Sequence, residues 1–425
     1  MPGARRTATR AWFGATALAC VAITAIVSRP FEFWVPDYGD ASAYAAYSRS
    51  PDFIGLSYQP LYPWLMWAIG RLGFDLAAVH ALQRAMFAAS AVILLLVVGR
   101  TVSPAAGVVA AGLLLLDLHF QFYIATALTE TTNLFLSVAL LYAVDRRLEP
   151  GGPRGAWLVA TAILLFLLST VRTSNVLFAS IVGVGWAVLA GTRVGREEAF
   201  PWAAAGVAAA LVILLQQAAI AGGRTNAGMV LGEFVSVACG RMPAECAADP
   251  EIPGPVADAD LWSEKTAGQM QAAWRRLIVH HPILFARGVA ATWKEQLVAE
   301  PFSVYPDDPN QKRVAGPPWA ILLAAGGIAA SVACATAPLA LLLVPFAVQR
   351  ARGDPRRQAL LVALGAWVLA EVVATTAFFA NAWNPDASRM RLHWELQAAL
   401  LWVVLADGWL RGRRVSPGAV GATGD

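Results

Sequence analysis

Long runs of apolar residues, separated by short polar and basic segments, dominate the pattern of this 425-residue chain. Ten of the runs are long enough, or nearly so, to cross the hydrocarbon core of a bilayer as helices, which takes about 20 residues. The predicted spans are Ala11–Val27, Leu76–Val98, Ala105–Leu118, Ala125–Val144, Ala156–Thr170, Asn175–Ala190, Pro201–Ile220, Pro317–Val348, Gln358–Ala380 and Leu392–Leu410. The pattern predicts an all-α polytopic membrane protein of about ten transmembrane helices, forming a single domain over residues 1–410.

Composition agrees with this fold class. Hydrophobic residues make up 58% of the chain and charged residues 14%, whereas about a quarter of the residues of a soluble domain are charged. The net charge is +4, but the arginines cluster at the ends of the apolar runs, as membrane topology requires. We therefore predict the lipid bilayer as a partner and exclude a nucleic acid.

Basic residues also predict the topology, because short cytoplasmic loops hold an excess of arginine and lysine. With the N-terminus inside, every inside segment is basic, including Arg5–Arg10, Arg146–Arg154 and Arg350–Arg357. Both termini are then cytoplasmic in a plasma (inner) membrane, and residues 411–425 form a disordered cytoplasmic tail. Two long segments, residues 28–75 and 221–316, are placed outside.

Both outer segments contain predicted juxtamembrane helices. Prolines and aromatic residues in Tyr58–Trp64 predict an interfacial helix that runs to Arg71. In the second outer segment, apolar residues recur at near-helical spacing over Leu261–His280 and Pro282–Val298. These helices are expected to be amphipathic and to lie against the membrane.

The first outer segment also carries an acidic, turn-rich stretch, Pro36–Tyr44, which contains Asp37 and Asp40. Asp40 is placed to cap a short helix over Ala41–Tyr47. A carboxylate at a helix N-terminus keeps its charge, which suits a general base that accepts a proton from an alcohol. The alternative is that Asp40 is a helix cap only.

Charged side chains near the outer ends of the spans form a second candidate set. Each costs roughly 2.5 to 3.5 kcal/mol in a membrane helix, so such residues are functional candidates. The set consists of Arg84, Glu130, Arg172, Arg389 and Arg391. Two alternatives remain open, since the arginines could snorkel to the interface and Glu130 could pair with an arginine inside the bundle. Glu371 lies deep in a span, where we expect a hydrogen bond facing the bundle.

Cys239 and Cys246 share one polar loop of the second outer segment. An oxidising compartment lets a disulfide persist, and no other pair of cysteines in the chain competes for either sulfur. We predict a disulfide that pins a local turn; the alternative is two free thiols that are close in sequence.

Several short motifs resemble those of the integral-membrane glycosyltransferases with the GT-C fold, such as the mannosyl-, arabinosyl- and aminoarabinosyltransferases that use polyprenyl-phosphate sugars. Gly39–Tyr44 resembles the Asp and Tyr motif of their first outer loop. The other similar elements are Gln59–Pro63, Arg84, Thr129-Glu130, Val171–Thr173 and Ser388–Leu392. The last of these resembles the Glu-Arg-Tyr-x-Leu-Pro element of many members, but Met390 replaces its Tyr and His393 replaces its Pro.

This resemblance implies a GT-C-like fold and an inverting glycosyltransferase that acts at the extracytoplasmic face. Asp40 would deprotonate the acceptor hydroxyl of a glycan, lipid or protein. The arginines would hold the phosphate of a polyprenyl-phosphate sugar donor, because guanidinium groups form charge-assisted hydrogen bonds with phosphate oxygens. Asp37 or Glu130 would orient the acceptor or bind a divalent cation, the only cofactor that we consider. The donor sugar and the acceptor are not specified by these residues.

Two other functions use outward-facing polar groups in membrane helices. A lipid-linked sugar flippase or other transporter is expected to show an inverted repeat and paired broken spans, which the sequence lacks. A polymerase of the O-antigen type also relies on outward arginines. The early acidic loop, with its spacing of Asp and Tyr, favours the transferase.

Overall fold

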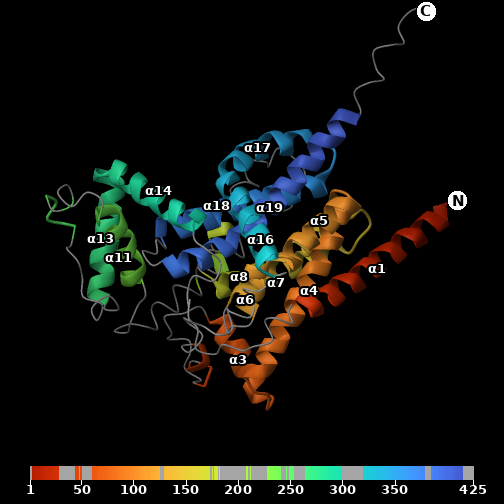
Figure 1. The fold of residues 1–425 in the computed structure, drawn as a ribbon, viewed down its shortest axis with the longest axis horizontal. Helices are drawn as coiled ribbons and strands as arrows, with labels where there is room; N and C mark the ends of the chain where they lie inside the picture. The colour runs from red at the N-terminus through yellow and green to blue at the C-terminus, as the bar shows by residue number, and fades with distance from the viewer. Residues whose placement is uncertain are drawn as a thin grey trace, which may run out of the picture.

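A computed structural model of the chain describes residues 2–27, 44–46, 48–49, 60–124, 129–172, 175, 177–179, 181, 207–208, 211, 227–240, 246, 248–252, 264–298, 319–378 and 384–414. Every regular element among these residues is a helix, as the sequence predicts. Figure 1 shows a helical bundle with a smaller group of helices, α11, α13 and α14, at one side.

The N-terminal half of the bundle is built on α4, which contacts α1, α3, α5, α6 and α7. Its helices are α1 (Pro2–Val27), α3 (Leu61–Arg71), α4 (Leu76–Thr101), α5 (Pro104–Leu115), α6 (Leu118–Ile124), α7 (Glu130–Arg147) and α8 (Arg154–Val171). Asp75 begins α4 by accepting hydrogen bonds from the backbone N–H groups of Ala77 (3.0 Å) and Ala78 (3.3 Å). The predicted interfacial helix is α3, and it ends at Arg71 as expected.

The C-terminal half surrounds α18, which is buried along most of its length and contacts α4, α7, α17 and α19. Its helices are α16 (Trp319–Ala335), α17 (Ala337–Arg350), α18 (Pro355–Val373), the π-helical turn η4 (Ala374–Phe378) and α19 (Asn384–Arg414). Trp367 of α18 is fully buried and packs on Phe178, with ring centroids 4.8 Å apart. This contact ties the two halves into one core.

Three described helices are long and apolar enough to cross a membrane: Ala77–Thr101, Arg154–Val171 and Pro355–Ala377. Shorter apolar helices occupy Ala11–Ile26 and Pro104–Leu115, and a third is Ala337–Arg350. The predicted spans Asn175–Ala190 and Pro201–Ile220 lie largely outside the described residues. The chain is therefore an all-α protein with membrane-type helices, and the number of ten spans stays a prediction.

One predicted span, Pro317–Val348, is wrong as a continuous helix. The structure ends α16 at Ala335 and begins α17 at Ala337, with Thr336 between them. Pro338 lies in the first turn of α17, where its missing N–H is tolerated, but its ring is incompatible with a helix that continues from Cys334. The proline thus divides one apolar run into two short helices.

Other boundaries also differ from the prediction. The segment after α5, expected to be a short connection, forms α6, which begins where Asp117 accepts a hydrogen bond from the N–H of Phe120 (3.0 Å). At the other end of the chain, α19 continues through the first four residues of the predicted tail, to Arg414. No proline or cap interrupts that stretch, and basic residues suit a helix C-terminus. The rest of the tail lies outside the described residues.

The helices α11 (Ala227–Gly240), α13 (Glu264–His280) and α14 (Pro282–Val298) form a small unit with its own apolar core. The predicted helices over 261–280 and 282–298 correspond closely to α13 and α14. Phe234, Ala273 and Leu277 are fully buried between the three helices. A disulfide joins Cys239 at the end of α11 to Cys246, whose Cα atoms are 5.7 Å apart.

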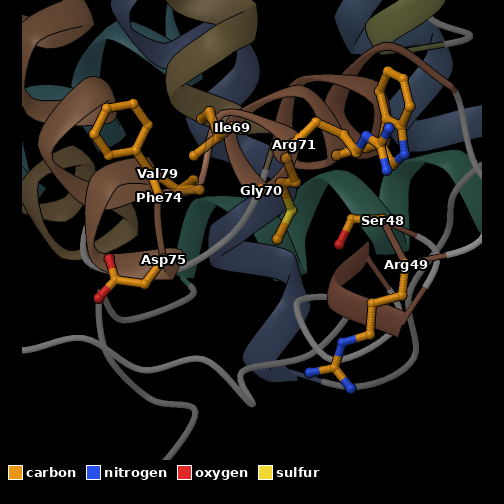
Figure 2. A pocket seen from close by; sticks show the side chains of 10 residues that line it. Ser48, Arg49, Ile69, Gly70, Arg71, Phe74, Asp75 and Val79 are labelled. Atoms are coloured by element: carbon orange, nitrogen blue, oxygen red, sulfur yellow. The ribbon is translucent and has the colours of Figure 1, made fainter.

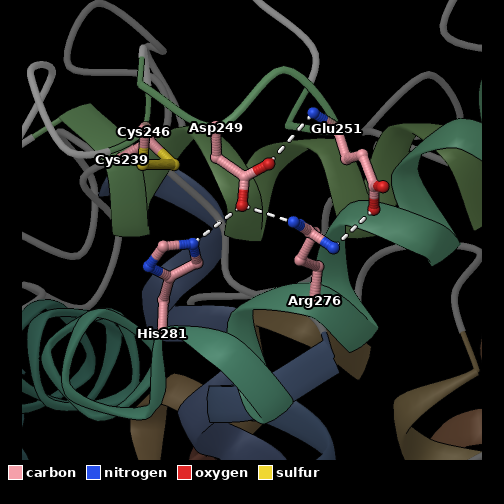
Figure 3. Close-up of polar contacts among 6 residues, drawn as sticks. All are labelled: Cys239, Cys246, Asp249, Glu251, Arg276 and His281. Carbon is pink, nitrogen blue, oxygen red and sulfur yellow. Dashed lines mark hydrogen bonds and ion pairs between the residues drawn. A yellow bond between two sulfur atoms is a disulfide. The ribbon is translucent and has the colours of Figure 1, made fainter.

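A polar cluster connects the loop after this disulfide to the junction of α13 and α14 (Figure 3). Asp249 accepts hydrogen bonds from Arg276 Nε (2.7 Å) and interacts with His281 Nε2 (2.8 Å). Arg276 also pairs with the exposed Glu251 (2.7 Å). The hydrogen bond from Arg276 is the main cause that holds the pKa of Asp249 well below its usual range, and the bond to His281 adds to it.

This cluster makes the unit sensitive to acid. Because the pKa of Asp249 is lowered by folding, its contribution to stability is present above the unfolded carboxyl pKa of about 3.9 and is lost below it. We expect the protection factors of the α13 amides, which correct for the intrinsic exchange rate at each pH, to fall as the pH drops below about 4. In Asp249→Asn, the protection factors should already be lower at pH 7 and should change less with pH.

Glu251→Gln is the matched control, since Glu251 contacts the same arginine but is 66% exposed, where ion pairs contribute little. Its exchange profile should follow that of the wild-type protein. An equal acid response in Asp249→Asn and the wild-type protein would show that other groups set the pH dependence.

The helices α4 and α5 cross at two glycines, Gly99 and Gly107. A Cβ atom on Gly107 would lie 2.7 Å from the carbonyl oxygen of Leu95 and 2.8 Å from the Gly99 backbone. We expect Gly107→Ala to force the helices apart and to destabilise the protein by about 1–3 kcal/mol. Gly112→Ala, on the same helix with nothing within 4 Å, should have little effect. Thermal unfolding in detergent compares the two, and equal melting temperatures would contradict the close crossing.

Candidate functional site

The two ends of the bundle differ in their charged contacts. At one end, Asp145 accepts hydrogen bonds from Arg356 Nε (2.6 Å) and Thr101 Oγ1 (3.2 Å), which joins α4, α7 and α18. We call this the Asp145 end. Since α7 begins at Glu130 and ends just beyond Asp145, Glu130 marks the opposite end, which we call the Glu130 end.

Glu130 and Arg172 meet at the Glu130 end. Glu130 begins α7 and Arg172 directly follows α8, so the antiparallel pairing of these two helices brings the residues together. Arg172 Nη1 lies 3.7 Å from Glu130 Oε1, and the side chains are 14% and 0% exposed. This distance is that of an ion pair and exceeds that of a hydrogen bond, so the contact with Glu130 itself occupies none of the guanidinium donors. The structure thus contains the ion pair that the sequence left open as an alternative for Glu130.

Tyr62 is a third member of this site. It lies in the first turn of α3, where Pro63 costs no helical hydrogen bond, and its ring packs edge-to-face on Tyr44 with centroids 5.3 Å apart. Within the described residues its hydroxyl has no hydrogen-bond partner, although the side chain is fully buried. Burial raises the pKa of Tyr62 well above its ordinary value, and the nearby charge of Glu130 raises it further. The hydroxyl therefore stays protonated and can donate to a ligand.

Amide and hydroxyl groups fix the helices around the ion pair. Asn175 Nδ2 donates to Asn133 Oδ1 (2.8 Å) and to the carbonyl of Leu168 (2.7 Å), which ties α7 to the end of α8. Thr132 Oγ1 lies 4.0 Å from the sulfur of Met86, so α4 packs on the same turn of α7. These contacts hold the loop that carries Arg172 in place.

Gln121 of α6 adds a buried amide to the Glu130 end. The helix α6 packs against α4, α7 and α16, and the Gln121 side chain is fully buried. Neither its Nε2 nor its Oε1 has a hydrogen-bond partner among the described residues. A buried amide without partners costs about 1–3 kcal/mol, so a ligand that satisfies it would bind more tightly.

The structure describes the remaining predicted site residues only in part. Arg84 lies in the first third of α4, half-buried and two residues before Met86. Arg389 and Arg391 lie near the start of α19, whose side chains the structure describes from Trp394 to Leu410. Asp37 and Asp40 are outside the described residues.

The topology nevertheless puts the start of α19 at the Glu130 end. The helix α18 leaves the Asp145 end at Arg356, and η4 and the start of α19 follow at its far end. Trp394 packs on Trp293 with ring centroids 6.0 Å apart, and its indole N–H donates to Gln296 Oε1 (3.3 Å). Arg84, Glu130, Arg172 and the backbone of Arg389 and Arg391 thus belong to the same half of the bundle.

Glu371 lies in α18 and is fully buried. Its backbone carbonyl accepts a hydrogen bond from Thr375 Oγ1 (2.7 Å), at the point where α18 gives way to η4. The side chain faces the bundle, and its hydrogen-bond partner stays a prediction.

Sequence reasoning did not select Tyr62, Gln121 or Asn175 as site residues. Tyr62 appeared in the interfacial helix and in the Gln59–Pro63 element, without a role of its own, and Asn175 only as the start of an apolar run. A signal was present for Gln121 and Asn175, because each is an uncharged polar side chain at the edge of a strongly apolar run, where a membrane helix would leave it unsatisfied.

The described residues contain no group of three or more His, Cys, Asp or Glu side chains arranged to hold a metal ion. Glu130 offers carboxylate oxygens of the kind that divalent cations prefer. Its proposed companion Asp37 is not described, so a divalent cation stays a prediction.

No protein-family model matches the chain, and no curated protein matches its sequence. Among solved structures, the chain is similar to the crystal structure of ArnT from Cupriavidus metallidurans in the apo state. The two are 14% identical, the match covers 88% of this chain and 78% of that chain, and the TM-score is 0.38. Similarity at this level defines neither a family nor a function for this chain.

Proposed function

We propose that this chain is an integral-membrane glycosyltransferase that moves a sugar from a polyprenyl-phosphate donor to an acceptor hydroxyl. The observation that carries the proposal is the pair of the buried Glu130 and the largely buried Arg172, with the Tyr62 hydroxyl nearby, which has no hydrogen-bond partner among the described residues. This arrangement combines a cation for a phosphate with polar groups for sugar hydroxyls. The sequence motifs of the first outer loop support it independently.

Each residue has a role in one displacement reaction. Asp40 accepts the proton of the acceptor hydroxyl as its oxygen forms a bond to the anomeric carbon of the sugar. The bond from that carbon to the phosphate oxygen breaks, and the electron pair leaves with the phosphate. A single displacement inverts the anomeric configuration.

The arginines stabilise the departing polyprenyl phosphate. Arg172 is held in place by Glu130, and Arg389, Arg391 and Arg84 complete the cationic group on the same half of the bundle. Glu130 therefore acts as a positioning residue for Arg172, and Asp37 orients the acceptor. A divalent cation, if the reaction uses one, would be held by Asp37 or Glu130. At the Glu130 end the sugar donor is a polyprenyl-phosphate sugar, so no nucleotide sugar is required there.

The same polarity of the bundle supports the proposed sidedness. The Asp145 end includes Arg146, Arg356 and Arg357, which belong to the basic segments assigned to the cytoplasm. The Glu130 end then faces the extracytoplasmic side. Nucleotide sugars remain in the cytoplasm, so a transferase on that side requires a sugar carried across on a lipid phosphate.

A membrane assay with a panel of radiolabelled polyprenyl-phosphate sugars tests the proposal. We expect the wild-type protein to transfer one sugar of the panel to membrane acceptors and to release polyprenyl phosphate. Membranes that contain Asp40→Asn serve as the paired sample. Transfer from nucleotide sugars alone, or movement of the intact lipid across the bilayer without cleavage, would overturn it.

A further inference from the structure

A cavity of about 780 Å³ opens beside α3, away from the site described above (Figure 2). Its wall combines three segments: the turn after Tyr44, the C-terminal half of α3 and the first turns of α4. The lining residues that matter below are Arg49, Trp67, Arg71, Phe74 and Asp75. Tyr62 lies nine residues before Arg71 on α3, which is roughly 14 Å along the helix axis.

The cavity is positively charged. Arg49 and Arg71 are both exposed, and neither has an ion pair among the described residues. The Arg71 guanidinium lies over the ring of Trp67, 6.0 Å from its centroid. Asp75 also lines the cavity, and its Oδ1 accepts hydrogen bonds from the backbone N–H groups that begin α4. Among the described residues, neither cation is neutralised by an ion pair.

The turn between α3 and α4 is fixed and apolar. Gly73 has a φ of +85°, and its N–H bonds to the carbonyl of Gly70 (3.0 Å) while that of Phe74 bonds to Ile69 (3.2 Å). This pairing is a Schellman motif, which ends α3 and turns its last side chains outward. Leu72 is 74% exposed and Phe74 61% exposed, so two large apolar side chains project beside Arg71.

The position of this turn explains its apolar surface. A helix long and apolar enough to cross a membrane begins at Ala77, only three residues after Phe74. We therefore expect the turn at the depth where lipid headgroups meet the hydrocarbon core, and where arginine and tryptophan are favoured. At that depth Leu72 and Phe74 would face acyl chains, and Arg49 and Arg71 would lie at phosphate level.

We propose that this cavity binds the phosphate headgroup of an anionic phospholipid of the surrounding bilayer. The Arg71 guanidinium, which the indole of Trp67 orients, recognises the phosphate diester, Arg49 adds positive charge to the cavity wall, and the apolar turn holds the acyl chains. The site is separate from the proposed donor site and does not depend on transfer activity.

Photocrosslinking of the full-length protein in nanodiscs tests the site. The probe is phosphatidylglycerol with a diazirine next to its headgroup, diluted into phosphatidylcholine, and labelled peptides are mapped by mass spectrometry. We expect label on residues 67–75 in the wild-type protein. In the double variant Arg49→Gln/Arg71→Gln, labelling of these residues should be roughly tenfold lower than in the wild-type protein, because basic residues near a membrane surface each attract anionic lipid.

The control is Lys265→Gln/Arg275→Gln, which removes the same charge from exposed positions of α13 and should keep the label. Equal labelling of residues 67–75 by a phosphatidylcholine probe would overturn the proposal, as would full labelling of the Arg49→Gln/Arg71→Gln variant. Displacement by polyprenyl phosphate at a lower mole fraction than phosphatidylglycerol would also overturn it, because the cavity would then belong to the donor lipid. Thermal unfolding of both variants verifies that each is folded.

Discussion

Asp40→Asn is expected to reduce glycosyl transfer by roughly 10²- to 10⁴-fold, the usual contribution of a positioned general base. Asparagine keeps the size of the side chain and can still cap a helix, but it cannot accept the acceptor proton. Expression and membrane insertion should therefore be unchanged. The measurement is the initial rate of sugar transfer from the lipid-linked donor identified with the panel.

Asp52→Asn is the matched control, because it makes the same substitution in the same outer segment. Its transfer rate should remain close to that of the wild-type protein. A pH profile of the transfer rate distinguishes a general base from a residue with only a structural role. The wild-type rate should fall as the pH drops through the carboxyl pKa, and the residual rate of Asp40→Asn should not. Near-normal turnover of Asp40→Asn would remove Asp40 as the base.

Arg172→Gln is expected to weaken binding of unsugared polyprenyl phosphate by roughly ten- to hundredfold, since charge-assisted hydrogen bonds to the phosphate are lost. The same variant leaves Glu130 buried without its cation, which costs about 3–5 kcal/mol of stability. Loss of binding in this single variant therefore has two explanations. Binding of the lipid to purified protein and the melting temperature must be measured together.

The double variant Glu130→Gln/Arg172→Gln separates the two explanations. It removes both charges, so the stability lost in Arg172→Gln should largely return, while the lipid affinity should stay low. Arg100→Gln, an exposed arginine at the Asp145 end, is the control for charge alone and should bind lipid normally. Recovery of both stability and lipid affinity in the double variant would show that Arg172 serves only to neutralise Glu130.

Local sequence patterns predicted the helices well where the periodicity and the turn residues that define a helix lie within one short segment. The apolar spacing over 282–298 matches α14, and the interfacial helix ends at Arg71 as predicted, because helical periodicity and turn residues act within a few positions. The break between α16 and α17 was also encoded locally, by Pro338. It was overlooked because the surrounding apolar run suggested a single long span.

The contacts of the candidate site could not be predicted in the same way. Glu130 and Arg172 are 42 positions apart, and whether they pair depends on how α7 packs against α8 rather than on either sequence motif. Tyr62 is drawn into the site by its packing on Tyr44, and hydropathy alone places it only at a membrane surface. A one-dimensional pattern assigns such residues to one side of a membrane but does not select their partners.

The ion pair at the Asp145 end has a consequence for biosynthesis. Asp145 is buried, and its partner Arg356 follows 211 positions later in the chain. At ordinary translation rates, roughly 10 to 40 seconds separate the synthesis of the two residues. During that interval the end of α7 holds a carboxylate without its cation, so it must stay in contact with water or with the insertion machinery. We therefore expect the first helices to enter the bilayer before they adopt their final packing, and this end of the bundle to close only after α18 has emerged from the ribosome.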